Sequence, residues 1–236
     1  MEKRNPWAWI PSLYFAEGLP YVVVMTLSVI MYKRLGVSNT DIALFTSWLY
    51  FPWVIKPIWS PFVDLIKTKR WWIYSMQLLI GGGMAGVAFV LPGDFFLRFT
   101  LAFFWLMAFS SATHDIAADG FYMLGLTEEQ QAFFIGIRNT FYRVAMLTGQ
   151  GLLVMLAGLL EESTGRISFA WSLVFFVLAG TFIALALWHK YILPRPASDA
   201  QRTNITPHTI LVEFGNTFVS FFSKKGIIPA LLFMLT

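Results

Sequence analysis

The sequence contains no cysteine, and only 13% of its 236 residues are charged. Without cysteine, a disulfide scaffold, a cysteine-ligated zinc site and an iron–sulfur cluster are excluded. The three histidines are scattered without metal-ligand spacing, and no glycine-rich phosphate-binding loop is present. We therefore predict no metal and no cofactor, and the sequence gives no support for a nucleotide-driven pump or a dinucleotide enzyme.

Apolar residues are in large excess. The chain is 57% hydrophobic and 18% aromatic, with a mean hydropathy of +0.64. A soluble domain has roughly 45–50% apolar and about 25% charged residues, so this excess would leave a continuous apolar surface in water. The apolar residues also form blocks of a length that crosses a hydrocarbon core about 30 Å thick as a helix. These features predict an all-α protein that crosses the lipid bilayer several times.

The apolar blocks predict six membrane spans, a connector and the start of a seventh span. The last apolar run reaches only ~16 Å as a helix, about half of a bilayer, so we expect the chain to be the N-terminal part of a longer protein. The predicted spans are Pro11–Tyr32, Ile42–Val63, Trp71–Leu91, Phe99–Leu124, Phe133–Leu160 and Phe169–Tyr191. The expected divisions are a six-span half at 1–192, a cytoplasmic linker at 193–225 and the start of span seven at 226–236.

Basic residues predict the orientation. With the N-terminus inside, ten Lys and Arg fall in inside loops and four in outside loops. Cytoplasmic loops carry such an excess, so the N-terminus is predicted to be cytoplasmic. The net charge of +4 is explained in the same way, and no nucleic-acid partner is predicted.

Six charged side chains lie inside the predicted spans. Each costs at least a few kcal/mol in lipid unless it has a partner or a water-filled cavity. At a rise of about 1.5 Å per residue, all of them fall in one layer between the cytoplasmic side and the midplane. They are three acids, Glu17, Asp115 and Asp119, and three bases, Lys56, Arg138 and Arg143.

This layer has two interpretations. Either it is a fixed salt-bridge cluster that holds the bundle together, or it is a polar cavity in which a carboxylate exchanges a proton while arginines hold an anion. For the second interpretation, Asp119 is the first candidate for the proton site, because Asp115 shares its helix face. The full set of candidates is Asp119, Asp115 and Glu17 for proton coupling, and Arg143, Arg138, Tyr142 and Lys56 for substrate binding.

The segment between spans two and three reads SPFVDLIKTKR at 60–70. It resembles the signature loop of the major facilitator superfamily, with Ser60 at the usual glycine and Leu65 at the usual arginine. The resemblance implies a cytoplasmic gating loop, made by Asp64, Lys67, Lys69 and Arg70. Anchoring by positive charge alone would explain the basic residues but not Asp64.

A more specific resemblance covers all six spans. Its motifs are THDIAADG at 113–120, RNTFYR at 138–143, GLP at 18–20 and WSP at 59–61. They resemble the AmpG-type muropeptide permeases and the related acetyl-coenzyme A transporters, within the major facilitator superfamily, although His114 stands where that branch has glutamine. The implied fold is the N-terminal six-helix half of a major facilitator bundle, completed by a C-terminal half of the same protein.

The resemblance implies proton-driven import of anhydro-muropeptides, which are anionic glycopeptides, across the bacterial inner membrane. The expected partners are thus this small-molecule substrate, protons and the bilayer, and no enzymatic activity is expected. Two alternatives stay open. One is a carrier of the same fold for another anionic conjugate, such as an acyl-coenzyme A, a nucleotide or an oligosaccharide. The other is a membrane enzyme or sensor, but the residues near Asp115 lack the second histidine or nucleophilic serine that catalysis would need.

Overall fold

The computed structural model describes residues 4–200 and, beyond them, residues 212, 214–216, 219–220, 223–224 and 226–227. In this part of the chain the regular structure is helical, without strands. The principal helices are α1 (Ile10–Val22), α2 (Ser28–Arg34), α3 (Asn39–Thr46), α4 (Phe51–Ile66), α5 (Lys69–Val90), α6 (Phe96–Gly125), α7 (Glu128–Leu147), α8 (Leu153–Thr164) and α9 (Ile167–Ile192). Short 3-10 or π segments are η1 (Pro6–Ala8), η2 (Val23–Leu27), η3 (Ser47–Tyr50), η4 (Thr148–Leu152) and η5 (Ala197–Asp199).

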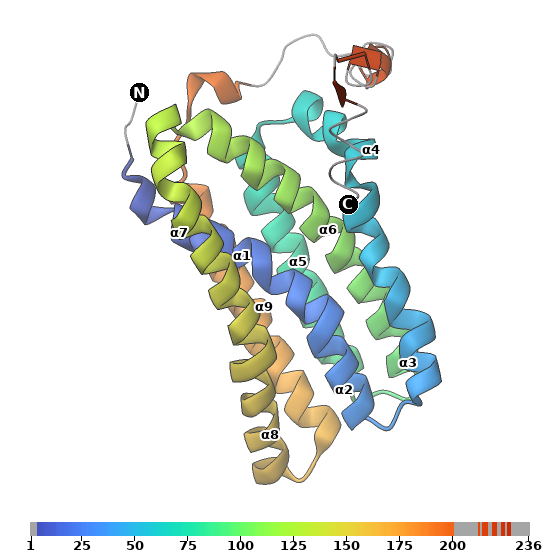
Figure 1. Ribbon diagram of the computed structural model, residues 1–236. Coiled ribbons are helices and arrows are strands. Elements are labelled where there is room, and N and C mark those ends of the chain that lie inside the picture. Colours follow the sequence, from blue (N-terminus) through green and yellow to red (C-terminus); the bar gives the residue numbers. More distant parts are fainter. Residues whose placement is uncertain are drawn as a thin grey trace.

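These elements form six rods that run up and down through one bundle (Figure 1). The first rod is η1 to α2, the second is α3 to α4, and the fifth is α7 to α8, while α5, α6 and α9 are single helices. Each rod agrees with one predicted span to within a few residues. We call the end at which α1 begins and α9 ends the N-terminal end of the bundle, and the other end the far end.

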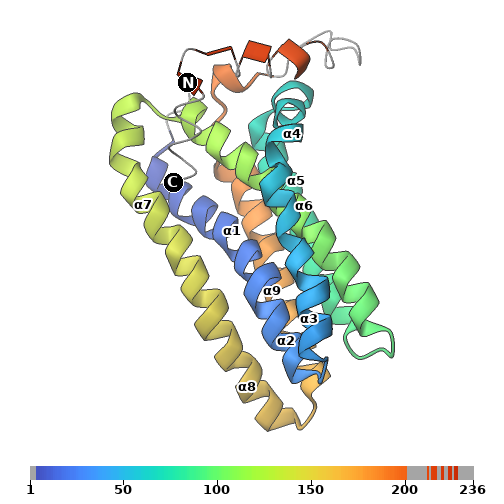
Figure 2. The ribbon, with the colours of Figure 1, turned by 45° about the vertical axis from the view of Figure 1, so that its right-hand side comes forward.

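Five of the described rods are long and apolar enough to cross a membrane. The rod at 39–66 is not among them, because its tryptophans, its prolines and Lys56 make it less apolar. It lies beside α6 along the same bundle (Figure 2). The protein is therefore an all-α membrane protein. The predicted linker at 193–225 and seventh span at 226–236 fall mostly outside the described residues.

The first rod runs through the middle of the bundle, and the fifth lies at its edge. Two thirds of the apolar stretch of the first rod, 67%, is buried, against 22% for the fifth. Behind the first rod, α5 packs against both α6 and α9. In both views α7 and α8 form one long rod along the edge of the bundle (Figures 1 and 2).

Small residues let the first and fifth rods approach closely. A Cβ atom on Gly18 would lie 2.9 Å from the backbone oxygen of Tyr142, and one on Gly149 would lie 2.2 Å from the Val22 side chain. The helix α1 continues through Pro20 and then becomes the π-helical η2. The facing η4 is also a π-helix. The two rods thus meet where both depart from regular α-helix.

A chain of buried polar side chains crosses the core near the N-terminal end. Ser12 Oγ lies 2.9 Å from His189 Nε2, and His189 Nδ1 lies 2.9 Å from Gln77 Oε1. Gln77 Nε2 lies 2.9 Å from His114 Nε2. The chain joins α1, α9, α5 and α6, so His114 is a packed core histidine.

Candidate functional site

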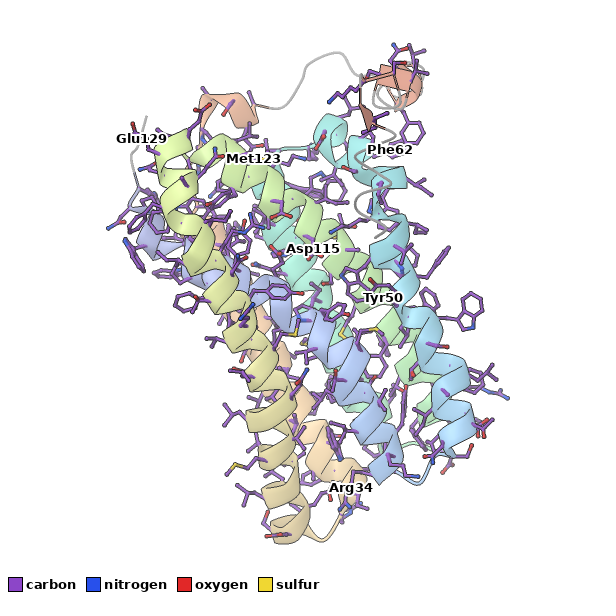
Figure 3. All side chains as sticks on the ribbon, in the orientation of Figure 1. Arg34, Tyr50, Phe62, Asp115, Met123 and Glu129 are labelled. Carbon is purple, nitrogen blue, oxygen red and sulfur yellow. The ribbon has the colours of Figure 1, made fainter. Side chains whose placement is uncertain are left out.

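The charged side chains inside the bundle meet in one cluster, which we call the polar cluster: Glu17, Lys56, Asp115, Asp119 and Arg138. They come from α1, α4, α6 and α7. Asp115 lies at mid-height of the bundle, between α1 and α4 in the view of Figure 3. The structure thus brings five of the six predicted charged residues together, and Arg143 is the exception.

Asp119 and Arg138 form the strongest contact of the cluster. Arg138 Nη2 donates to Asp119 Oδ1 at 2.8 Å, and the Tyr14 hydroxyl donates to the same oxygen at 3.4 Å. The guanidinium also lies 4.4 Å from the ring centre of Tyr14 and 5.0 Å from that of Tyr122, a geometry that attracts a cation. The Asp119 side chain is still 45% exposed, so a solute can reach this pair.

Asp115 and Glu17 are more deeply buried and incompletely paired. Lys56 Nζ lies 3.8 Å from Asp115 Oδ2, which is an ion pair without a short hydrogen bond. The other Asp115 oxygen, Oδ1, and Oε2 of Glu17 are buried without a hydrogen-bond partner. Glu17, 8% exposed, lies within electrostatic range of Asp115, Asp119, Arg138 and Lys56. Buried unpaired carboxylate oxygens are costly, and each one calls for an explanation such as a functional role, a bound water or an ion.

Two other predicted binding residues are placed differently. Tyr142 contacts Gly18 through its backbone and lies within electrostatic range of Asp115 and Glu17. Arg143 is exposed. It lies five residues beyond Arg138, which turns it to another side of α7. Among the described residues, no hydrogen bond or ion pair joins Arg143 to the polar cluster.

The predicted gating loop connects α4 to α5 at the N-terminal end. Asp64 pairs with Lys69 Nζ, and the buried Lys69 stem lies against Gly120, where an added Cβ would be 2.8 Å from it. Arg70 donates to the carbonyls of Lys190 and Leu193 at the end of α9. Lys67 is the C-cap residue of α4, directly after the last helical residue. Asp64 therefore pairs within its own loop.

Some residues of the site have no counterpart in the sequence prediction. Tyr14 and Gln77 are polar side chains within apolar stretches of the sequence, and this pattern could have identified them as candidates. Asp199 accepts hydrogen bonds from the backbone of α5, and no local pattern predicts a contact across 130 residues. In the described part of the chain, no group of three His, Asp or Glu side chains is arranged to hold a metal ion.

Matches to a known family and to several relatives bear on this bundle. Residues 16–198 match the BT1 family. Over 61% of this chain and 30% of the relative, the sequence is 31% identical to the anhydromuropeptide permease of Escherichia coli K12. It is 26% identical to an uncharacterized protein of Haemophilus influenzae over 94% of this chain and 50% of the relative. An uncharacterized protein of Schizosaccharomyces pombe is 28% identical over 56% of this chain and 27% of the relative.

The long apolar rods make this a multi-pass membrane protein, and the family match and the likeness to a permease support the permease or transporter class. The chain belongs to the BT1 family. This confirms the resemblance to the AmpG-like permeases inferred from the motifs. The match to the permease covers 30% of that relative's length, and the match to the Haemophilus protein covers half.

Proposed function

We propose that this chain belongs to a secondary active transporter that imports anhydro-muropeptides, driven by protons, across the bacterial inner membrane. The single observation that carries the proposal is the polar cluster, which buries carboxylate oxygens without partners next to a reachable arginine–carboxylate pair. The likeness of the chain to an anhydromuropeptide permease supports the choice of substrate in this proposal. The N-terminus is cytoplasmic in this proposal, and further spans of the same protein complete the pathway.

In this proposal Arg138 binds a carboxylate of the substrate. A guanidinium can donate two parallel hydrogen bonds to such a group, and Asp119 holds it in place when no substrate is bound. The substrate carboxylate then replaces Asp119 on Arg138. Tyr14 and Tyr122 keep the guanidinium oriented during the exchange because they lie against its face. Arg143, Tyr142 and Lys56 remain proposed binding residues, of which Lys56 and Tyr142 lie at or beside the cluster.

Proton coupling is assigned to the three carboxylates, Asp119, Asp115 and Glu17. An acid with an unpaired buried oxygen releases desolvation cost when it takes up a proton. Release of Asp119 from Arg138 by the substrate would then make it a proton acceptor as well. Substrate binding and proton uptake thus favour each other, which is the requirement for symport.

The test is uptake of labelled anhydro-muropeptide by the full-length protein in proteoliposomes, with and without an inward proton gradient. We expect accumulation only with the gradient. Asp119→Asn should abolish accumulation but keep exchange of substrate across the membrane, while Asp94→Asn, at an exposed position at the far end, should change neither. If correctly inserted protein shows no uptake in either condition, anhydro-muropeptides are not the substrate. Other anionic conjugates would then be tested.

A further inference from the structure

The start of α5 is capped by a side chain from far along the sequence. Asp199, in η5, accepts the backbone N–H of Lys69 through Oδ1 at 2.6 Å and that of Arg70 through Oδ2 at 3.1 Å. The local cap residue, Thr68, accepts the N–H of Trp71 at 3.1 Å. The first amides of a helix have no partner within the helix. Here Thr68 and Asp199 together cap the start of α5, and Asp199 belongs to the segment that follows α9.

The segment 193–199 bridges three helix ends. Arg70 of α5 donates to the carbonyls of Lys190 and Leu193, which belong to the end of α9. Ser198 Oγ lies 3.4 Å from the carbonyl of Leu124 near the end of α6. The ends of α5, α6 and α9 are therefore joined by the first residues of the predicted linker, beside η5 at the N-terminal end (Figure 1).

Lys69 connects this bridge to the gating loop. Its backbone N–H is bound by Asp199, its ammonium pairs with Asp64, and its stem lies against Gly120. Gly120 follows Asp119, which belongs to the polar cluster. Lys69 is also within electrostatic range of the Asp199 carboxylate. A shift of Asp199 would therefore move the first turn of α5 and, through it, the contact between Lys69 and Asp64.

We propose that Asp199 is a positioning residue for the gating loop: by capping α5 it holds Lys69 between Asp64 and Gly120 and ties the segment 193–199 to the N-terminal end of the bundle. Displacement of this segment and rearrangement of the gating loop then occur together. The cap itself does not depend on what is transported, and only the transport arm of the test rests on the proposed function.

The first arm measures the cap directly by hydrogen–deuterium exchange of the full-length protein. Loss of a helix cap lowers stability locally, so Asp199→Ala should reduce the protection of the Lys69 and Arg70 amides by about two- to thirtyfold. The start of α7, which has its own complete cap by Thr127 and Gln130, should not change. The matched control is Asp94→Ala. Unchanged protection in Asp199→Ala would overturn the proposal.

The second arm separates positioning from plain structural support. If Asp199 acts through Lys69, Asp64→Asn should add little to the exchange at 64–70 once Asp199→Ala is present, and the two effects should not be additive. Additive effects would show that Asp199 does not act through Lys69, and would overturn the positioning role.

The third arm is transport of labelled anhydro-muropeptide. Because gating steps often set turnover, Asp199→Ala should change the maximal rate by about threefold or more while leaving KM within about twofold. Asp199→Asn, which retains one acceptor oxygen, should lie between this variant and the wild type. A lost cap with an unchanged rate would overturn the gating role. If the wild type itself takes up no anhydro-muropeptide, the proposed function fails, and the two exchange arms still decide the contact.

Discussion

Two regions of this bundle bring opposite charges together, but the carboxylate oxygens are fully hydrogen-bonded in one region and only partly in the other. At the far end, Arg34 of α2 donates to both oxygens of Glu161 of α8, with Nε 3.0 Å from Oε2. Trp171 Nε1 of α9 donates to Oε1 of the same carboxylate at 2.8 Å. Both oxygens of Glu161 therefore have partners. Arg34 is labelled at this end of the bundle, well away from Asp115 at mid-height (Figure 3).

In the polar cluster the pairing is incomplete. Asp119 has two donors on one oxygen, but Asp115 and Glu17 each keep a buried oxygen without a partner. The contrast separates a structural contact from a site. The contacts of Glu161 with Arg34 and Trp171 tie three rods together, and both oxygens of Glu161 accept a hydrogen bond. The polar cluster retains acceptors that a proton or a donor group of a substrate can fill.

The largest expected effect comes from replacing those two carboxylates with amides, which cannot titrate. Glu17→Gln and Asp115→Asn, made separately, should reduce gradient-driven accumulation of anhydro-muropeptide to background, because an amide cannot bind and release the proton. Glu161→Gln is the control, and it should leave accumulation near the wild-type level. Uptake assays in proteoliposomes provide the measurement. Full activity in both cluster variants would make the cluster a structural contact like the one at the far end.

The next effect compares the two arginines of α7. Arg138→Lys retains the charge but loses the planar fork and its stacking on Tyr14, so KM should rise about tenfold or more. Arg143→Lys should raise KM less, since Arg143 is exposed and lies outside the cluster. Initial uptake rates over a range of substrate concentrations test this. Equal increases would place both arginines on the substrate.

A third comparison concerns buried polar groups that do have partners. Gln77→Leu would leave His189 Nδ1 and His114 Nε2 without partners in the core, so we expect a loss of about 1–3 kcal/mol in the free energy of unfolding. Ser111→Ala is the matched control, because the buried Ser111 hydroxyl has no partner to lose, and its removal should be neutral or stabilising. Thermal unfolding in detergent measures both. A larger loss of stability in Ser111→Ala than in Gln77→Leu would contradict the assigned hydrogen-bond chain.

The smallest effect is a pH dependence at the Asp199 cap. Burial raises the pKa of Asp199 above its usual value, against the opposing influence of the Lys69 and Arg70 amides and charges. A docked carboxyl with a raised pKa binds its proton more tightly than a free one, so docking is strongest below the ordinary pKa of about 4 and weakens as the pH rises through the raised value.

Exchange at Lys69 and Arg70, corrected for the intrinsic pH dependence of exchange, is the measurement for this effect. Protection should fall as the pH rises, and the fall should disappear in Asp199→Asn. A fall of the same size in that variant would assign the pH dependence to another group, of which the facing Lys69, Arg70 and Asp64 are the first to test.

The sequence predicted the fold well and the site in part. Apolar blocks located the rods to within a few residues. The loop that resembles a gating loop contains an Asp64–Lys69 ion pair, and its gating role stays a prediction. The rotation of each helix was harder to predict. Arg138 and Arg143 look equivalent in the sequence, yet only Arg138 meets Asp119. Tyr14 enters the site for the same reason, because the face that α1 turns toward α6 is set by packing.

The sequence by itself determined that this chain crosses the membrane as helices and that charged side chains fall inside these helices. The physical reason is that lipid satisfies no backbone polar group, so crossing requires long apolar helical blocks, and a charge within such a block is a conspicuous exception. Only the tertiary structure decided which charges meet. Close approach of α1 to α7 at Gly18 and Tyr142 and the return of Asp199 to α5 depend on contacts between distant segments, and no local pattern in the sequence contains them.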